Sequence, residues 1–306
     1  MKFNKKFSLI LLIMFLGILL AGSIIFFVQS RFKAAVTTVN TQNAKIAYYI
    51  RGKGDPIVLL PGFGMTMSGW DPLFLEKLAA NHELIILDYR GVGASTGFVN
   101  NVTEAQLADD VHAVLQQLKL KKATLLGWSM GSFVAQVVAE KYPSSVDKLI
   151  LISTGPGDKQ EIGASAAISD AIENNLGGSW ETTYVPYLFA SEQGKNDYLQ
   201  RLHLALQSKE IPNVPAESLE AKVGYEKMFA DADAENMRYT KLSSLHMQTL
   251  IVGGEQDKLL PPENDKRTAA QIPGSTIIIF SQAGHAVLFE KVDEVTSLIN
   301  TFLRRK

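Results

Sequence analysis

One short turn constrains the fold of this chain more than any other feature: the sequence Gly-Trp-Ser-Met-Gly at residues 127–131. It follows the apolar strand predicted at Ala123–Leu126 and precedes the helix predicted from Gly131 to Lys141. A serine between two glycines in this context is typical of a sharp, strained turn that raises the hydroxyl above the carboxyl end of the strand. Ser129 is therefore the candidate nucleophile.

Short apolar strands alternate with amphipathic helices along most of the chain beyond Val36. This alternation predicts a mostly parallel sheet with helices on both faces. The predicted strands are Lys45–Ile50, Ile57–Leu60, Glu83–Leu87, Ala123–Leu126, Lys148–Ile152, Gln248–Val252 and Thr276–Phe280, and the predicted helices are Thr103–Leu118, Gly131–Lys141 and Glu294–Leu303. Residues 103–106 read as a helix capping box, although Asn101–Thr103 is also a glycosylation sequon.

The strand pattern stops between Gly155 and Ser243. This segment is rich in Ala, Glu, Leu and Tyr and is interrupted by glycine and proline, which predicts several short helices. We therefore expect a core of residues 34–154 and 244–306, with a helical insertion at residues 155–243.

The N-terminus contains a long apolar run. Phe7–Val28 is 22 residues without a charge, with three lysines before it and two basic residues after it. As a helix it would extend about 33 Å, enough for the ~30 Å hydrocarbon core of a bilayer. We expect residues 1–33 to be a single-pass membrane anchor, with the rest of the chain outside the cytoplasm because of the lysines before the run. The alternative is a signal sequence cleaved near residues 21–23, which would make the protein secreted.

Composition excludes several classes of function. Beyond residue 33 the chain carries 25 basic and 31 acidic residues, so it lacks the positive charge that binds nucleic acids. It has no cysteine, and no histidine–carboxylate spacing is typical of a metal site, so we expect no metal. Gly91-Val92-Gly93 lacks the third glycine of a dinucleotide loop, and we expect no cofactor.

A serine nucleophile needs a base at the same edge of the sheet. Of the five histidines, only His285 follows a predicted strand in a turn that contains glycine. His82 and His246 precede strands at the opposite edge, His112 lies on a predicted helix, and His203 lies in the insertion.

The base in turn needs a carboxylate to fix its tautomer. Asp257 follows the predicted strand at Gln248–Val252 and is the candidate acid, with Asp158 and Glu255 as alternatives. The oxyanion of an acyl-transfer reaction needs two N–H donors. The backbone of Met130, next to the nucleophile, and of Phe63, in the glycine-containing loop after the strand at Ile57–Leu60, are the candidates.

These motifs together resemble the α/β-hydrolase fold family, and the resemblance covers the chain from Thr37 to its end. The segments that carry it are residues 57–64 (IVLLPGFG), 88–95 (DYRGVGAS) and 127–131 (GWSMG), then Asp257 and Gly284-His285. The resemblance implies that Ser129, Asp257 and His285 are nucleophile, acid and base, and that residues 155–243 form a cap over the active site. Pro61 stands where the family often has a histidine.

The expected function is hydrolysis of a small, mostly apolar carboxylic ester through an acyl-enzyme. Trp128, Trp180, Tyr184 and Phe189 are candidates for the substrate pocket. The same residues would also serve an amidase or aminopeptidase that resembles proline iminopeptidases, or a cofactor-free haloperoxidase-like enzyme. An inactive ligand-binding homologue is the alternative that is not an enzyme.

Overall fold

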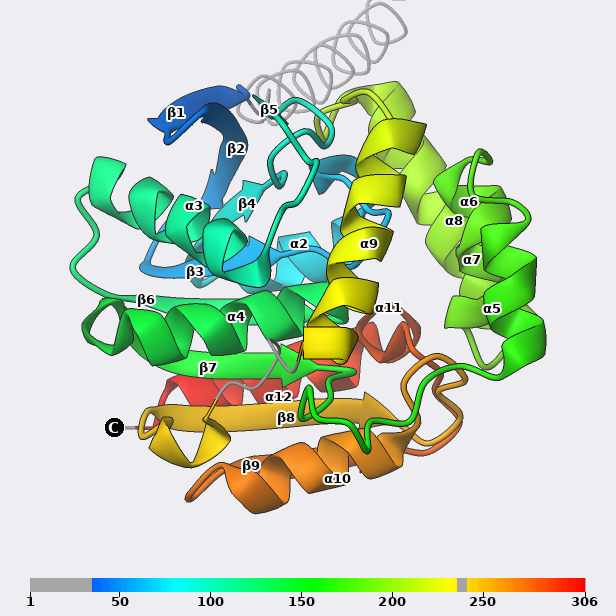
Figure 1. The fold of residues 1–306 in the computed structure, drawn as a ribbon. Coiled ribbons are helices and arrows are strands. Elements are labelled where there is room, and N and C mark those ends of the chain that lie inside the picture. The colour runs from blue at the N-terminus through cyan, green and yellow to red at the C-terminus, as the bar shows by residue number, and fades with distance from the viewer. Residues whose placement is uncertain (1–34, 236–240, 306) are drawn as a thin grey trace, which may run out of the picture.

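The computed structural model describes residues 35–235 and 241–305, and in that part of the chain nine strands form one sheet (Figure 1). The strands are β1 (Thr37–Thr41), β2 (Ala44–Gly52), β3 (Asp55–Leu60), β4 (His82–Leu87), β5 (Thr96–Gly97), β6 (Ala123–Trp128), β7 (Val146–Ile152), β8 (Gln248–Gly254) and β9 (Thr276–Phe280). Their order is β1-β2-β4-β3-β6-β7-β8-β9, with β5 beside β2. The ladder is antiparallel up to the β2–β4 pair and parallel from β4 to β9.

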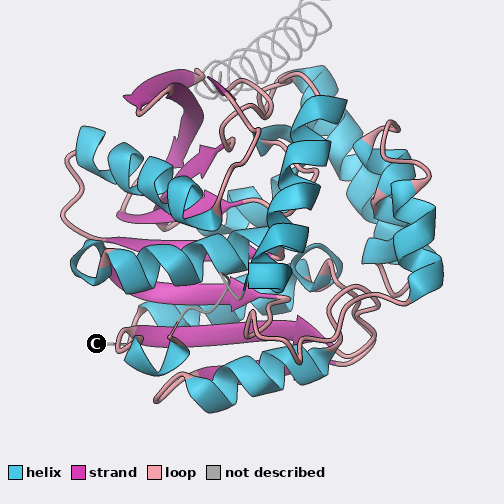
Figure 2. Ribbon diagram, in the orientation of Figure 1, coloured by secondary structure: helices cyan, strands magenta, loops and turns pink. Residues whose placement is uncertain are grey.

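Helices cover both faces of this sheet (Figure 2). They are α2 (Pro72–Ala79), α3 (Glu104–Gln117), α4 (Met130–Lys141), α5 (Ala166–Glu173), α6 (Trp180–Thr183), α7 (Val185–Leu188), α8 (Glu192–Ser208), α9 (Leu219–Glu235), α10 (Pro262–Gln271), α11 (Val287–Glu290) and α12 (Val292–Leu303), with 3-10 turns at Met67–Gly69, Pro143–Ser145 and Leu242–Ser244. The predicted mostly parallel sheet with helices on both faces is confirmed.

Alternate side chains of the central strands pack into two separate hydrophobic cores. On one face, Val58 and Leu125 belong to a cluster with the buried sides of α3 and α4, which we call the α3–α4 core. On the other face, Leu59 and Leu126 join a cluster with α2 and α12, which we call the α2–α12 core. The period of two in a strand places neighbouring side chains on opposite faces, so continuous apolar runs such as these are what a doubly covered sheet requires.

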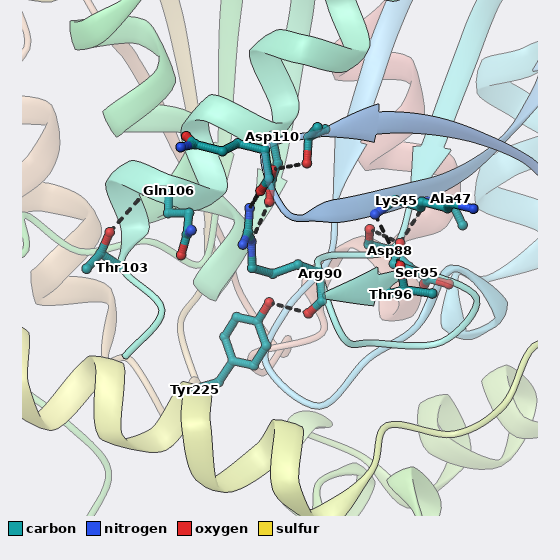
Figure 3. Close-up of polar contacts among 12 residues, drawn as sticks. Lys45, Ala47, Asp88, Arg90, Ser95, Thr96, Thr103, Gln106, Asp110 and Tyr225 are labelled. Atoms are coloured by element: carbon teal, nitrogen blue, oxygen red, sulfur yellow. Dashed lines mark hydrogen bonds and ion pairs between the residues drawn. The ribbon is translucent and has the colours of Figure 1, made fainter. Parts of the chain in front are cut away.

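The helices α5 to α9 lie between β7 and β8 in the sequence and stand at the carboxyl ends of the parallel strands (Figure 1). They contact the loops that follow β3 and β4. The Tyr198 hydroxyl on α8 donates to the Gly69 carbonyl (2.8 Å), and the Tyr225 hydroxyl on α9 donates to the Arg90 carbonyl (2.9 Å; Figure 3). Arg90 itself forms a buried ion pair with Asp110 of α3 (2.7 Å).

The predicted membrane anchor needs correction. Among residues 35–235 and 241–305, no helix is long and apolar enough to cross a bilayer. The predicted span, Phe7–Val28, lies outside the described residues. The structure therefore does not support the predicted membrane anchor. It also does not support the location outside the cytoplasm, which depended on that anchor.

Candidate active site

Ser129 occupies a strained turn at the carboxyl end of β6. It has φ 53° and ψ −123°, a backbone conformation that residues with a side chain rarely adopt, and it forms the N-cap of α4. Its hydroxyl makes no capping hydrogen bond to that helix. A Cβ at Gly127 would lie 2.2 Å from the Gly131 carbonyl oxygen, and one at Gly131 would lie 2.0 Å from that of Leu60. The turn therefore needs both glycines, and it leaves the half-buried serine hydroxyl available.

His285 and Asp257 form a buried pair at the same edge of the sheet. Nδ1 of His285 lies 2.7 Å from Oδ2 of Asp257, and the side chains are 2% and 0% exposed. The other carboxylate oxygen, Oδ1, accepts the backbone N–H groups of Leu259 and Leu260, both at 2.9 Å. These bonds fix the carboxylate so that Nδ1 donates to it, which makes Nε2 the acceptor nitrogen of a neutral imidazole.

The backbone of His285 is tied to the strand that carries the nucleophile. Its carbonyl oxygen accepts from the Trp128 indole N–H (2.9 Å) and from the Ser153 hydroxyl (2.8 Å). Trp128 is the last residue of β6 and directly precedes Ser129, while Ser153 follows β7. The loop that bears the histidine is therefore anchored to the carboxyl ends of β6 and β7.

The other candidate carboxylates have different surroundings. Arg267 binds the Asp158 carboxylate at 2.6 Å, and Glu255 is exposed.

The other four histidines either contact other residues or are exposed to solvent. His82 Nε2 pairs with the Asn300 amide at 3.0 Å, His112 stacks on Tyr142, His203 pairs with Glu181, and His246 is exposed. Of the histidine–carboxylate pairings weighed from the sequence, the structure brings together His285 and Asp257.

The loop after β3 approaches the serine closely. A Cβ at Gly62 would lie 3.3 Å from the Ser129 Cβ. The Met65 N–H donates to the Gly62 carbonyl (3.2 Å), and Gly64 has φ +76°, the positive value that a type II turn requires at its third residue. Gly62, the residue before Phe63, therefore packs against the serine turn, and Met130 is the first residue of α4.

A buried carboxylate that the sequence reasoning gave no role holds this loop in place. Oδ1 of Asp88 accepts from the Met67 N–H (2.5 Å) and Oδ2 from the Ala94 N–H (2.9 Å). Figure 3 shows Asp88 beside Ser95, whose hydroxyl donates to the Asp88 carbonyl (2.8 Å). Burial raises the pKa of Asp88 to about 7, and its two backbone hydrogen bonds oppose that rise. Asp88 thus links the loop after β3 to the loop after β4.

Of the four residues predicted for the substrate pocket, two lie within a hydrophobic core and two lie in the helical segment with contacts to the loops around the serine. Trp128 and Phe189 are buried in the α2–α12 core, where Phe189 packs on Tyr198 (5.3 Å between ring centroids). Trp180 is half-buried, and its ring meets Trp128 edge-on at 6.1 Å. Tyr184 packs against Phe63 (5.6 Å). Aromatic contacts therefore lead from the serine turn into the helical segment.

A cavity of about 480 Å³ opens beside these aromatic residues. Its wall includes Gly64 and Met65 of the loop after β3, Trp180 of α6, and the charged residues Glu217 and Lys222. Glu217 and Lys222 were missed from the sequence, where they look like ordinary solvated charges. Across residues 35–235 and 241–305 no group of three or more acidic or histidine side chains is arranged to hold a metal ion.

Comparisons with known proteins agree with this architecture. The family model described as the alpha/beta hydrolase fold matches residues 55–292. A pimeloyl-(acyl-carrier protein) methyl ester esterase from Aliivibrio salmonicida is 28% identical over 260 residues, which are 83% of this chain and 94% of the relative. A proline iminopeptidase from Pestalotiopsis fici is 29% identical over 281 residues, 88% and 100% of the two chains. A solved thermophilic esterase from Thermogutta terrifontis superimposes with a TM-score of 0.69 at 26% identity, covering 89% and 98%.

Proposed function

The chain belongs to the α/β-hydrolase fold family, and on that premise we propose that it is a serine hydrolase that cleaves a small, mostly apolar carboxylic ester through an acyl-enzyme. The observation that carries the proposal is the buried His285–Asp257 pair, with the His285 carbonyl bound by the residue before Ser129. Esterases among the similar proteins support the choice of an ester.

In the proposed mechanism, His285 Nε2 takes the Ser129 hydroxyl proton as the serine oxygen attacks the ester carbonyl. The negative charge on the tetrahedral oxygen is stabilised by the N–H groups of Phe63 and Met130. Collapse of this intermediate breaks the bond to the alcohol, which leaves with the proton from His285. Water then gives a proton to His285 as it attacks the acyl carbonyl. Collapse of the second tetrahedral intermediate breaks the bond to the serine oxygen, which takes that proton from His285 as the acid is released. Asp257 holds the imidazole and stabilises its positive charge.

We further propose that residues 155–243 act as a cap that selects the substrate. The contacts of α8 and α9 with the loops after β3 and β4 support this role, because the loop after β3 packs against the serine turn and is joined to the loop after β4 through Asp88.

The proposal is tested with a series of p-nitrophenyl esters. Each methylene buried adds ~0.8 kcal/mol, or roughly fourfold in kcat/KM, until the pocket is full. We expect activity to rise from acetate toward butyrate or hexanoate and then to fall. A response that does not vary with chain length would contradict an apolar acyl site.

The roles of individual residues are tested separately. A fluorophosphonate should label Ser129 alone, as located by mass spectrometry. Ser129→Ala and His285→Ala should each lower kcat by ~10⁴-fold, with little further loss in the double variant. Asp257→Asn should be severe but milder. If Asp158→Asn is the damaging substitution instead, the assigned acid is wrong.

A second function is favoured by one relative. The proline iminopeptidase from Pestalotiopsis fici matches 88% of this chain, so an aminopeptidase or amidase is the competing assignment. Aminoacyl p-nitroanilides belong in the same assay. A strong preference for them over the alkyl esters would replace the esterase assignment.

A further inference from the structure

Glu217 is a buried carboxyl with an unsatisfied oxygen. Its side chain borders the cavity of about 480 Å³, and the residue is 8% exposed. Its Oε2 atom is fully buried and has no hydrogen-bond partner among the described residues. Leaving such an atom without a partner is costly, so a group retained in this state calls for a ligand. Burial raises the pKa of Glu217 to about 8, with Lys222 opposing the rise.

A second unsatisfied group lies near Glu217. The hydroxyl of Tyr184 is buried and has no hydrogen-bond partner among the described residues. The Tyr184 ring packs against two residues of the cavity wall, Gly64 and Lys222. Burial raises the pKa of Tyr184, and the charge of Glu217 raises it further. The phenol offers a donor and an acceptor, and so does a protonated carboxyl.

The ammonium group of Lys222, on the same cavity wall, already has hydrogen-bond partners. Lys222 Nζ donates to the carbonyls of Leu176 (2.9 Å) and Gly178 (2.7 Å), and lies 5.7 Å from the centroid of the Tyr184 ring. Its positive charge would repel an ammonium group in the cavity, and a carboxylate group would lose its hydration beside a carboxyl that is itself buried. An uncharged hydrogen-bonding group avoids both costs.

The cavity borders the loop that carries the candidate oxyanion donor. Gly64, on its wall, follows Phe63, the candidate oxyanion donor. A Cβ at Gly64 would lie 2.4 Å from the Tyr184 ring, so the tyrosine packs directly on this loop. Trp180, also on the wall, contacts Trp128, which precedes Ser129. A substrate bound at the serine could therefore extend into the cavity.

We propose that Glu217 and Tyr184 bind an uncharged polar group, a hydroxyl or an amide, at the far end of the substrate. This inference rests on the proposed function and narrows its substrate class to apolar esters with a polar end.

The test compares p-nitrophenyl ω-hydroxyhexanoate with p-nitrophenyl hexanoate, which differ in the terminal hydroxyl. The readout is the ratio of their kcat/KM values. Glu217→Leu should lower this ratio about tenfold, the effect of losing one hydrogen bond to a buried polar group. Glu217→Gln, which can still donate and accept, should retain most of it, and Tyr184→Phe should lower it several-fold. Glu220→Gln is the matched control, because Glu220 is exposed three residues further along.

Two more measurements separate this inference from the proposed function. Calorimetry of the full-length Ser129→Ala protein with methyl ω-hydroxyhexanoate and methyl hexanoate tests the subsite without turnover, and Glu217→Leu in that background should abolish the preference for the hydroxyl. If neither p-nitrophenyl ester is cleaved, the proposed function fails while the binding result still decides the subsite. The melting temperature of Glu217→Leu should not fall, because the substitution removes an unsatisfied buried carboxyl.

Three results would overturn the inference. The first is an equal loss with both esters together with a lower melting temperature, which would make Glu217 structural. The second is an unchanged ratio in Glu217→Leu. The third is preference for an ester with a terminal amine or carboxylate over the hydroxyl.

Discussion

Replacing Gly131 by alanine adds one carbon at the tightest point of the serine turn. That Cβ would lie 2.0 Å from the Leu60 carbonyl oxygen and 2.8 Å from that of Pro61. Carbon and oxygen atoms in contact are normally about 3.3–3.6 Å apart. The start of α4 must therefore move away from β3 by roughly 1 Å. Leu60 is paired with Gly127, so this movement disturbs the last pair between β3 and β6.

The loss of unfolding free energy in Gly131→Ala depends on which atoms have to move. Adding a methyl group to a packed interior costs about 1–3 kcal/mol, and we expect the upper end here because backbone, not a side-chain tip, must give way. At about 2–4 °C per kcal/mol for a domain of this size, the melting temperature should fall by roughly 6–12 °C. Displacement of the Met130 N–H and the serine by about 1 Å should also lower kcat about 10²-fold.

The assay measures thermal unfolding and p-nitrophenyl butyrate hydrolysis for the wild type and two variants. Gly163→Ala is the control, because a Cβ at Gly163 meets nothing within 4 Å. It should behave as the wild type in both measurements. If Gly131→Ala keeps its melting temperature and its kcat, close packing of the turn against β3 is not what positions the serine.

Three further predictions concern groups around the site. Asp110→Asn should lower the free energy of unfolding by about 3 kcal/mol, because it leaves the Arg90 charge buried, whereas Asp109→Asn breaks an exposed pair and should cost under ~1 kcal/mol in the same denaturant titration. The pKa of Asp88 rises to about 7 on folding, so the folded protein holds a proton that the unfolded chain releases. The free energy of unfolding should therefore fall as pH rises from about 4 to about 7, by up to about 4 kcal/mol. The denaturant midpoint is measured across this pH range for the wild type and Asp88→Asn. If the midpoint of the variant falls with pH as steeply as that of the wild type, Asp88 is not the cause. Trp128→Phe loses the hydrogen bond to the His285 carbonyl and should cost about 1–2 kcal/mol, seen as a lower melting temperature.

Seven of the nine described strands, all but β1 and β5, could be predicted from sequence because the sheet is covered on both faces. Ile57–Leu60 and Lys148–Ile152 are continuous apolar runs, and both fall within observed strands, β3 and β7. The cap of α3 was also visible: the Thr103 hydroxyl accepts from the Gln106 N–H (3.2 Å), as the capping box predicts.

Three helices of the described chain, α2, α10 and the four-residue α11, were not predicted because they lack an apolar stripe long enough to see. Helix α2 has eight residues, and its signals are the Asp71 cap and the proline that follows. Helix α10 is mainly polar, and it buries Asn264 and Asp265 instead of an apolar face. A helix that buries polar groups gives no hydrophobic period, so only the packed structure reveals it.

The candidate catalytic residues and the candidate subsite differ in how visible they are. Ser129, Asp257 and His285 each follow a strand, so the strand pattern alone places them at one edge. Glu217 has no such signal, because in sequence it cannot be told from Glu220, which is exposed. The difference between them arises from how the helical segment packs on the loop after β3, and local sequence does not encode that packing.

The division of the interior into two cores has a consequence for engineering the protein. The β-sheet backbone separates the α3–α4 core from the α2–α12 core, so Leu107 on one side and Phe74 on the other share no neighbours across it. Changes in unfolding free energy at sites without shared partners add to within a few tenths of a kcal/mol. Stabilising substitutions can therefore be selected independently in each half of the interior and then combined, whereas substitutions of residues in contact within one half must be tested together.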